Sequence, residues 1–193
     1  SIGSIDIQPL NRILLHNVLI EDLNKDTIIS AKTIRVSVLW FNNDANVLKF
    51  NRISLVDAYI NFNTDSLGSM NLENLLNKFF PPDTIITPTS AKPFAIEIKN
   101  IKIENSRFRL ASFNPTKQEH GINFEDMDLR KLNIDAKDFG LHRDTVSLLV
   151  NDLSFVEKSG FYAEKIRMEF SFSSKHMNFD KLRIKALGSN IQM

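Results

Sequence analysis

The residues most suggestive of chemistry are two tripeptides, Asp138-Phe139-Gly140 and His142-Arg143-Asp144. They spell two signatures of protein kinases, in which the second tripeptide precedes the first by many residues and a glycine-rich loop lies upstream. Here the order is reversed, the tripeptides are adjacent, and the 193-residue chain has six glycines and no such loop. The pair therefore predicts a polar turn between Ile134 and Leu148 and not a kinase site.

The other candidates for catalysis or metal binding are scattered. The four histidines are His16, His120, His142 and His176. No two of them are three or four residues apart, which excludes a metal-binding pair on a helix. Asp126 and Asp128 could share a strand face, but their surroundings lack the spacing of a calcium loop. With no cysteine, no Gly-x-Ser-x-Gly motif and no phosphate loop, we expect no catalytic residues, no metal and no cofactor.

Charge gives no reason to expect a nucleic-acid partner. The chain has 24 Lys and Arg against 23 Asp and Glu, for a net charge of +1, so it lacks a bulk field for polyanions. The most basic stretch, from Lys92 to Arg109, alternates cations with Phe94 and Phe108. On a strand, alternating residues point to opposite faces, whereas a base-stacking platform needs both types on one face.

Period-two alternation of apolar and polar residues dominates the chain and predicts strands. The runs that show it are Ile34–Leu39, Ile53–Phe62, Ile96–Leu110, Ile122–Leu132, Leu148–Phe155, Ile166–Phe172 and Phe179–Ile184. Phenylalanine is frequent, with 15 residues against two tyrosines and one tryptophan. These side chains favour apolar filling over polar-tipped recognition. We expect a mainly β chain.

One segment departs from this pattern. Leu72, Leu75, Leu76 and Phe79 have helical spacing, and Pro81-Pro82 would end a helix there. We therefore expect a first β-section over residues 1–80 that ends in a short amphipathic helix at 71–80. A joint rich in proline and threonine over 81–94 would lead to a second β-section at 95–193. We also expect the chain to be a fragment of a longer protein.

The strand units resemble one another. Leu48–Leu55 followed by Ala58–Phe62 matches Ile96–Ile103 followed by Ser106–Leu110. In each copy an Asn or Asp sits where the apolar alternation shifts by one residue, and a bulge or corner can absorb such a shift. The units therefore predict strand, corner and strand, stacked into a coiling sheet.

The apolar face of this sheet has two possible uses. It can be a groove that shelters acyl chains, or it can be the packed core of a structural or adhesive β-sandwich. Both need a continuous dry face, so alternation by itself does not separate them.

Seven segments in a fixed order span nearly the whole chain. They are Leu14–Asp22, Asp26–Ala31, Ile53–Ala58, Asn71–Leu76, Ile101–Ser106, Glu157–Phe161 and Ala186–Ile191. In this order the segments resemble the TamB/AsmA-like family, in particular the N-terminal region of TamB-like proteins of Bacteroidetes-type bacteria.

The resemblance implies a periplasmic segment of a protein anchored in the inner membrane of a Gram-negative bacterium. Such proteins form an extended, curved antiparallel sheet whose hydrophobic groove is thought to guide phospholipids or to assist outer-membrane assembly. The resemblance implies two partners for this chain, phospholipid acyl chains and an outer-membrane β-barrel assembly protein. It implies no catalytic residues. The expected groove lining is Ile53, Leu55, Ile96, Ile98, Ile101, Ile103, Phe108, Leu110, Phe124, Leu129, Leu153, Phe155, Met168 and Phe170.

Overall fold

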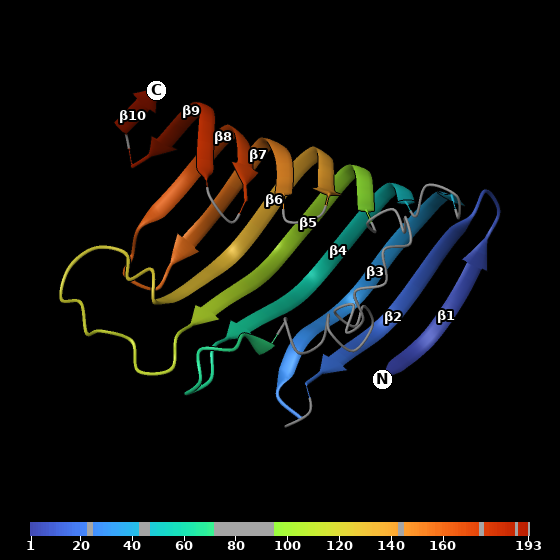
Figure 1. Cartoon of the computed structure of the whole chain (residues 1–193), viewed down its shortest axis with the longest axis horizontal. Coiled ribbons are helices and arrows are strands. Elements are labelled where there is room, and N and C mark those ends of the chain that lie inside the picture. Colours follow the sequence, from blue (N-terminus) through green and yellow to red (C-terminus); the bar gives the residue numbers. More distant parts are fainter. Residues whose placement is uncertain are drawn as a thin grey trace, which may run out of the picture.

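A single sheet contains every strand that the computed structural model describes (Figure 1). The described residues are 1–22, 25–42, 47–71, 95–142, 145–173, 176–187 and 189–192. The strands are β1 (Ile2–Gln8), β2 (Arg12–Glu21), β3 (Thr27–Asn42), β4 (Val47–Asn63), β5 (Ala95–Ala111), β6 (Asp126–His142), β7 (Thr145–Glu157), β8 (Tyr162–Phe172), β9 (Met177–Ala186) and β10 (Ser189–Gln192). Within these ranges no helix is long and apolar enough to cross a membrane.

The strands lie side by side in the order of the sequence, from β1 to β10. Neighbours are antiparallel with one exception: β4 and β5 run parallel, from the pair Val47 and Ala95 to the pair Asn63 and Ala111. Among the described strands β1 and β10 do not pair with each other, so the sheet stays open. The expected extended, curved β-sheet is confirmed, and the parallel pair makes it a mixed sheet.

Two of the predicted connections between strands can be compared with the structure only in part. The predicted helix at 71–80 lies outside the described residues from Leu72 onward, as does the joint at 81–94. The strand expected from Ile122 begins only at Asp126, because residues 112–125 form a loop. In this loop the Thr116 amide donates to Glu125 at 2.6 Å, and the Asn123 side chain donates to the Thr116 carbonyl at 2.8 Å. These side-chain bonds satisfy backbone groups that a ladder would otherwise use.

A line of corners crosses the strands. Asn17, Asp57, Asn105 and Lys131 have φ angles near +50°, in the left-handed region. Polar side chains join the corners of adjacent strands: Asn105 donates through Nδ2 to Asp57 at 2.6 Å, and its amide donates to Asn133 Oδ1 at 3.0 Å. A left-handed residue breaks the alternation of an extended strand. Apolar side chains before and after the corner can therefore lie on the same face.

A second line of irregularities lies further along the strands. Asn51 and Asn151 are extra residues at register shifts, where the sequence predicts a change of phase. Asp138 and Lys181 have φ angles of 54°, and each also lies beside a register shift. Because the corners and these irregularities each bend the strands, the long strands arch and the sheet curls around one face, here called the inner face (Figure 1).

Small side chains occupy the inner face beside the first line of corners. Ala31, Ala58 and Ser106 are buried there, and the Ala58 amide donates to Ser106 Oγ at 3.0 Å. In β6 to β8 the same level holds the buried cluster of Leu132, Phe155 and Ala163. Half-buried residues from both sides of the corner pack against this cluster, which agrees with one continuous inner face.

The corner at Asn105 allows a test of this geometry. Asn105→Val should lower the free energy of unfolding by about 1–3 kcal/mol more than Asn105→Gly, because a β-branched residue is strained at positive φ. Both variants lose the side-chain hydrogen bond to Asp57 and keep the backbone amide that donates to Asn133, so glycine is the matched control. Urea denaturation measures the difference. Equal stabilities would show that the left-handed conformation is not retained.

Candidate functional site

A row of ten aliphatic side chains crosses the entire sheet, one from each strand, here called the aliphatic row. Each member is the direct register partner of the next, and residues paired in this way project from the same face. The row runs Ile5, Leu15, Ile34, Leu55, Ile103, Ile134, Leu153, Ile166, Ile184 and Ile191. At about 4.8 Å between strands it extends over about 43 Å.

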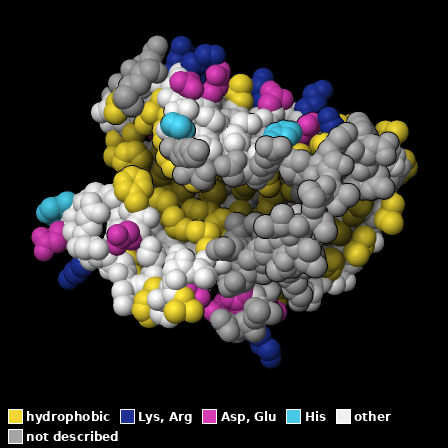
Figure 2. Space-filling view, viewed as in Figure 1, with side chains coloured by type: hydrophobic (Ala, Val, Ile, Leu, Met, Phe, Trp, Pro, Cys, Tyr) yellow, Lys and Arg dark blue, Asp and Glu magenta, His cyan; other side chains and the backbone are white. Residues whose placement is uncertain are grey.

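Further apolar rows flank the aliphatic row on the same face. The second row runs Ile7, Ile13, Val36, Ile53, Ile101, Ala136, Val150 and Met168. Aromatic residues join it towards one rim, where Phe170 and Phe179 stack with ring centroids 5.3 Å apart. Figure 2 shows a hollow between the two rims of the curled sheet, with hydrophobic side chains on its floor. We call this hollow, lined by the rows of the inner face, the trough.

The trough is apolar without being sealed by the described residues. Apart from Ile5 and Ile191, the members of the aliphatic row are half-buried. Those two, on the outermost strands, are 56% and 51% exposed. All the described strands belong to the one sheet, so no second sheet among them covers these side chains.

The opposite face, here called the outer face, carries cross-strand ion pairs. Lys49 lies 2.7 Å from Glu97 on the next strand, and Lys165 lies 2.6 Å from Asp152. Exposed pairs of this kind contribute little stability individually. The charged residues alternate with the apolar ones along each strand, and this alternation places the ion pairs on the outer face and the apolar side chains on the inner face.

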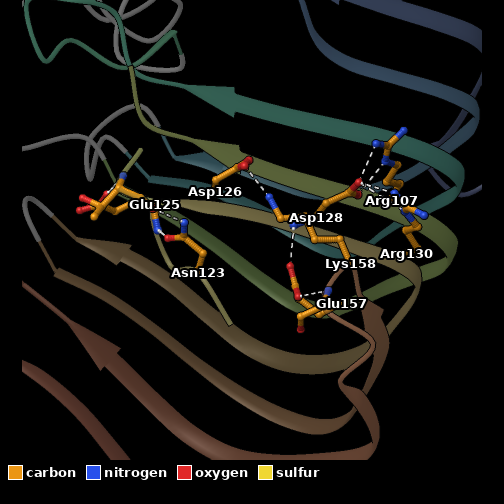
Figure 3. Close-up of polar contacts among 10 residues, drawn as sticks. Arg107, Asn123, Glu125, Asp126, Asp128, Arg130, Glu157 and Lys158 are labelled. Carbon is orange, nitrogen blue, oxygen red and sulfur yellow. Dashed lines mark hydrogen bonds and ion pairs between the residues drawn. The ribbon is translucent and has the colours of Figure 1, made fainter. Parts of the chain in front are cut away.

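The most buried charges form a cluster near one rim (Figure 3). Arg107 binds Asp128 in a bidentate arrangement, with Nε–Oδ1 and Nη2–Oδ2 distances of 2.7 Å, and Arg130 Nη2 lies 3.0 Å from Oδ2. The Arg107 guanidinium also lies 5.2 Å from the centroid of the Tyr59 ring. The hydrogen bonds from Arg107, with those from Arg130, outweigh burial and lower the pKa of Asp128 to about 2.

Glu157 connects this cluster to the next hairpin. It accepts the Asp128 amide at 3.3 Å and the Ser159 amide at 2.7 Å. Burial raises the pKa of Glu157, but the hydrogen bonds from Ser159, Asp128 and Lys158 hold it below its usual value. Every buried polar side-chain atom in the described residues has a partner. The cluster is therefore satisfied internally and fastens β5, β6 and the β7–β8 turn.

The structure brings together all of the predicted lining residues except Phe124. Leu55, Ile103 and Leu153 belong to the aliphatic row, and Ile53, Ile101 and Met168 belong to the second row. Towards one rim lie Ile96, Ile98 and Phe170, and towards the other lie Phe108, Leu110, Leu129 and Phe155. Phe124 is 73% exposed in the loop before β6.

Sequence reasoning missed Ile134 in the central strand β6 and the members of the aliphatic row from the strands on either side, which are Ile5, Leu15, Ile34, Ile166, Ile184 and Ile191. The same alternation marks them, but their place in the row depends on strand order, which alternation does not give.

The residues of the two kinase-like tripeptides that the structure describes belong to the sheet. Asp138 is a corner residue, and Phe139 pairs with Ile98. The polar turn expected between Ile134 and Leu148 is wrong for the described residues there, because β6 continues to His142 and β7 begins at Thr145. Arg143 and Asp144 lie outside the described residues. Nor do the described residues contain a group of His, Asp and Glu that could hold a metal ion.

Comparison with known proteins identifies no family for this chain. No protein-family model matches the sequence, and no curated protein matches it. The described trough offers a long apolar surface, and the cross-strand ion pairs Lys49–Glu97 and Lys165–Asp152 lie on the other face. Such a surface binds by removing apolar area from water, without needing a specific polar contact.

The Arg107–Asp128 pair predicts a pH dependence of stability. Because the pKa of Asp128 falls from 3.8 to about 2 on folding, its contribution is present above pH 3.8 and is lost as pH falls towards 2. Asp128→Asn should therefore be less stable than the wild type at neutral pH by about 2 kcal/mol or more. The difference should shrink between pH 4 and pH 2. Denaturation curves across this range measure it, and a difference independent of pH would contradict the assignment.

Proposed function

We propose that this chain is a non-enzymatic lipid-transfer segment that shelters phospholipid acyl chains in the trough. The observation that carries the proposal is the aliphatic row, which crosses ten strands without a polar interruption. An acyl chain gains about 0.8 kcal/mol for each methylene removed from water. A dry surface about 43 Å long therefore suffices to hold one or more acyl chains along the strand order.

The repetition of the row favours movement of the ligand over tight fixation. Each step from one strand to the next offers another branched aliphatic side chain at nearly the same spacing, so neighbouring positions along the row are similar in free energy. A lipid can therefore shift along the sheet without losing much buried apolar area at any point. The open side of the trough lets a polar headgroup stay in water while the acyl chains are covered.

The alternative of a packed β-sandwich has less support. A sandwich needs a second sheet about 10 Å from the first, with interdigitating side chains. The described strands all belong to one sheet, and the inner face stays half-buried over the central strands.

The proposal includes the setting that the family resemblance implies. The chain would act in the periplasm of a Gram-negative bacterium, as part of a protein of the TamB/AsmA-like type held at the inner membrane. The trough would carry phospholipid towards the outer membrane or assist an outer-membrane β-barrel assembly protein there. The features that support this setting are the extended curved sheet and its one apolar face, which the resemblance to that family also implies.

Lipid extraction tests the proposal directly. The natively folded protein, purified without detergent, should yield phospholipid in the organic phase, detected by mass spectrometry in amounts comparable with the protein. A folded, lipid-free protein that also fails to bind a fluorescent phospholipid would overturn the proposal and favour a structural scaffold.

A pair of adjacent variants separates the trough from the outer face. Ile103→Glu places a carboxylate in the centre of the aliphatic row and should weaken phospholipid binding about tenfold or more, since 1.4 kcal/mol corresponds to a factor of ten. Lys102→Glu changes the neighbouring residue, whose half-exposed side chain pairs with Glu104 on the outer face, and should leave binding unchanged. Fluorescence titration measures both, with circular dichroism to show that each variant is folded. Equal loss in both variants would contradict binding in the trough.

A further inference from the structure

Strand β1 presents a long unpaired edge in the described part of the chain. It spans Ile2–Gln8, pairs there only with β2, and all seven of its residues are exposed. Ile7 is 82% exposed although it belongs to the second apolar row. The backbone groups on such an edge are a template for another strand.

This edge lacks the features that usually prevent strand addition. Proteins protect their edges with lysine, proline, bulges or very short strands. β1 contains neither lysine nor proline, and its only charged residue is Asp6. Its register with β2 is regular from Ser4 to Gln8 and is interrupted at Gly3, opposite the corner residue Asn17.

The sequence of β1 is complementary to itself. Ile5 is the midpoint of the strand, so antiparallel pairing about Ile5 aligns two copies over residues 3–7 of β1. In that register Ile5 faces Ile5 of the second copy, and Ile7 faces Gly3, which has no side chain to crowd it. Asp6 faces Ser4, so the two carboxylates are not opposed, and direct opposition of like charges would be destabilising.

We propose that two copies of this chain pair through β1, antiparallel and with Ile5 on the twofold axis. An isologous contact of this kind closes as a dimer. A twofold axis perpendicular to the sheet keeps both inner faces on the same side. The aliphatic row then continues across the junction from Ile5 of one copy to Ile5 of the other, and the two troughs form one. This pairing is independent of lipid binding, because it depends only on the edge of β1.

Single-cysteine variants test the register. The chain has no cysteine, so Ile5→Cys introduces a single thiol that would face its counterpart across the axis. The Cα separation of directly opposed residues in antiparallel strands, about 4.5–5.5 Å, suits a disulfide. Mild oxidation of the lipid-free protein should convert most of Ile5→Cys into a linked dimer on a non-reducing gel. Leu10→Cys, in the turn after β1 and 78% exposed, is the control and should remain mostly monomeric.

Mass measurement tests the pairing without a cross-link. Light scattering of the unmodified protein should show a rise from monomer to dimer mass with concentration. Ile7→Lys adds an inward-pointing charge to the edge and should raise the dimer dissociation constant at least about tenfold. Leu10→Lys, which alters a similarly exposed residue away from the edge, should not change it. A monomer at every concentration, or equal cross-linking of the two cysteine variants, would overturn the proposal, whether or not the protein binds lipid.

Discussion

The inner face depends on a few residues that adopt a left-handed backbone at the same level of neighbouring strands. A strand as long as β4 or β5 cannot follow a tight curve while keeping strict alternation, because a bend without a change of phase would turn apolar side chains outward. Asp57 and Asn105 provide that change in adjacent strands and bond to each other at 2.6 Å. Their polar side chains also satisfy groups that the irregular ladder exposes. The bend and the dry face therefore have the same cause.

The two faces of the sheet carry different kinds of side chain. Ionic side chains pair across strands on the outer face, as Lys49 does with Glu97, while branched aliphatic residues meet in rows on the inner face. Because the two kinds of residue alternate, each additional strand extends both patterns at once. Length is thus gained by repetition, without the need to design a larger core.

Much of the fold could be predicted from the sequence. Alternation predicted β3 to β9 in part, whereas β1, β2 and β10 were not among the predicted runs. Asn51 and Asn151 mark register shifts where the phase changes. The parallel pairing of β4 with β5 could not be predicted, because the similarity between the two units is compatible with either direction. The end of the loop, residues 122–125, was mistaken for a strand start because Ile122 and Phe124 continue the alternation. There, hydrogen bonds made by Asn123 and Glu125 prevail over the pattern. The apolar face of each predicted strand could be inferred from the phase of its alternation. The full aliphatic row across ten strands could not, because it depends on the order of the strands in the sheet.

The open sheet has a mechanical consequence. In the described part of the chain, each strand has substantial contacts only with its neighbours in the sequence, and the two rims of the trough are connected through the curvature of the strands between them. Widening the mouth therefore requires small changes in bend and twist shared among many residues, while the hydrogen bonds between strands stay intact. The described sheet is stiff along the strand order and compliant across the mouth. Its cross-section can therefore widen or narrow while the pairing between strands is kept.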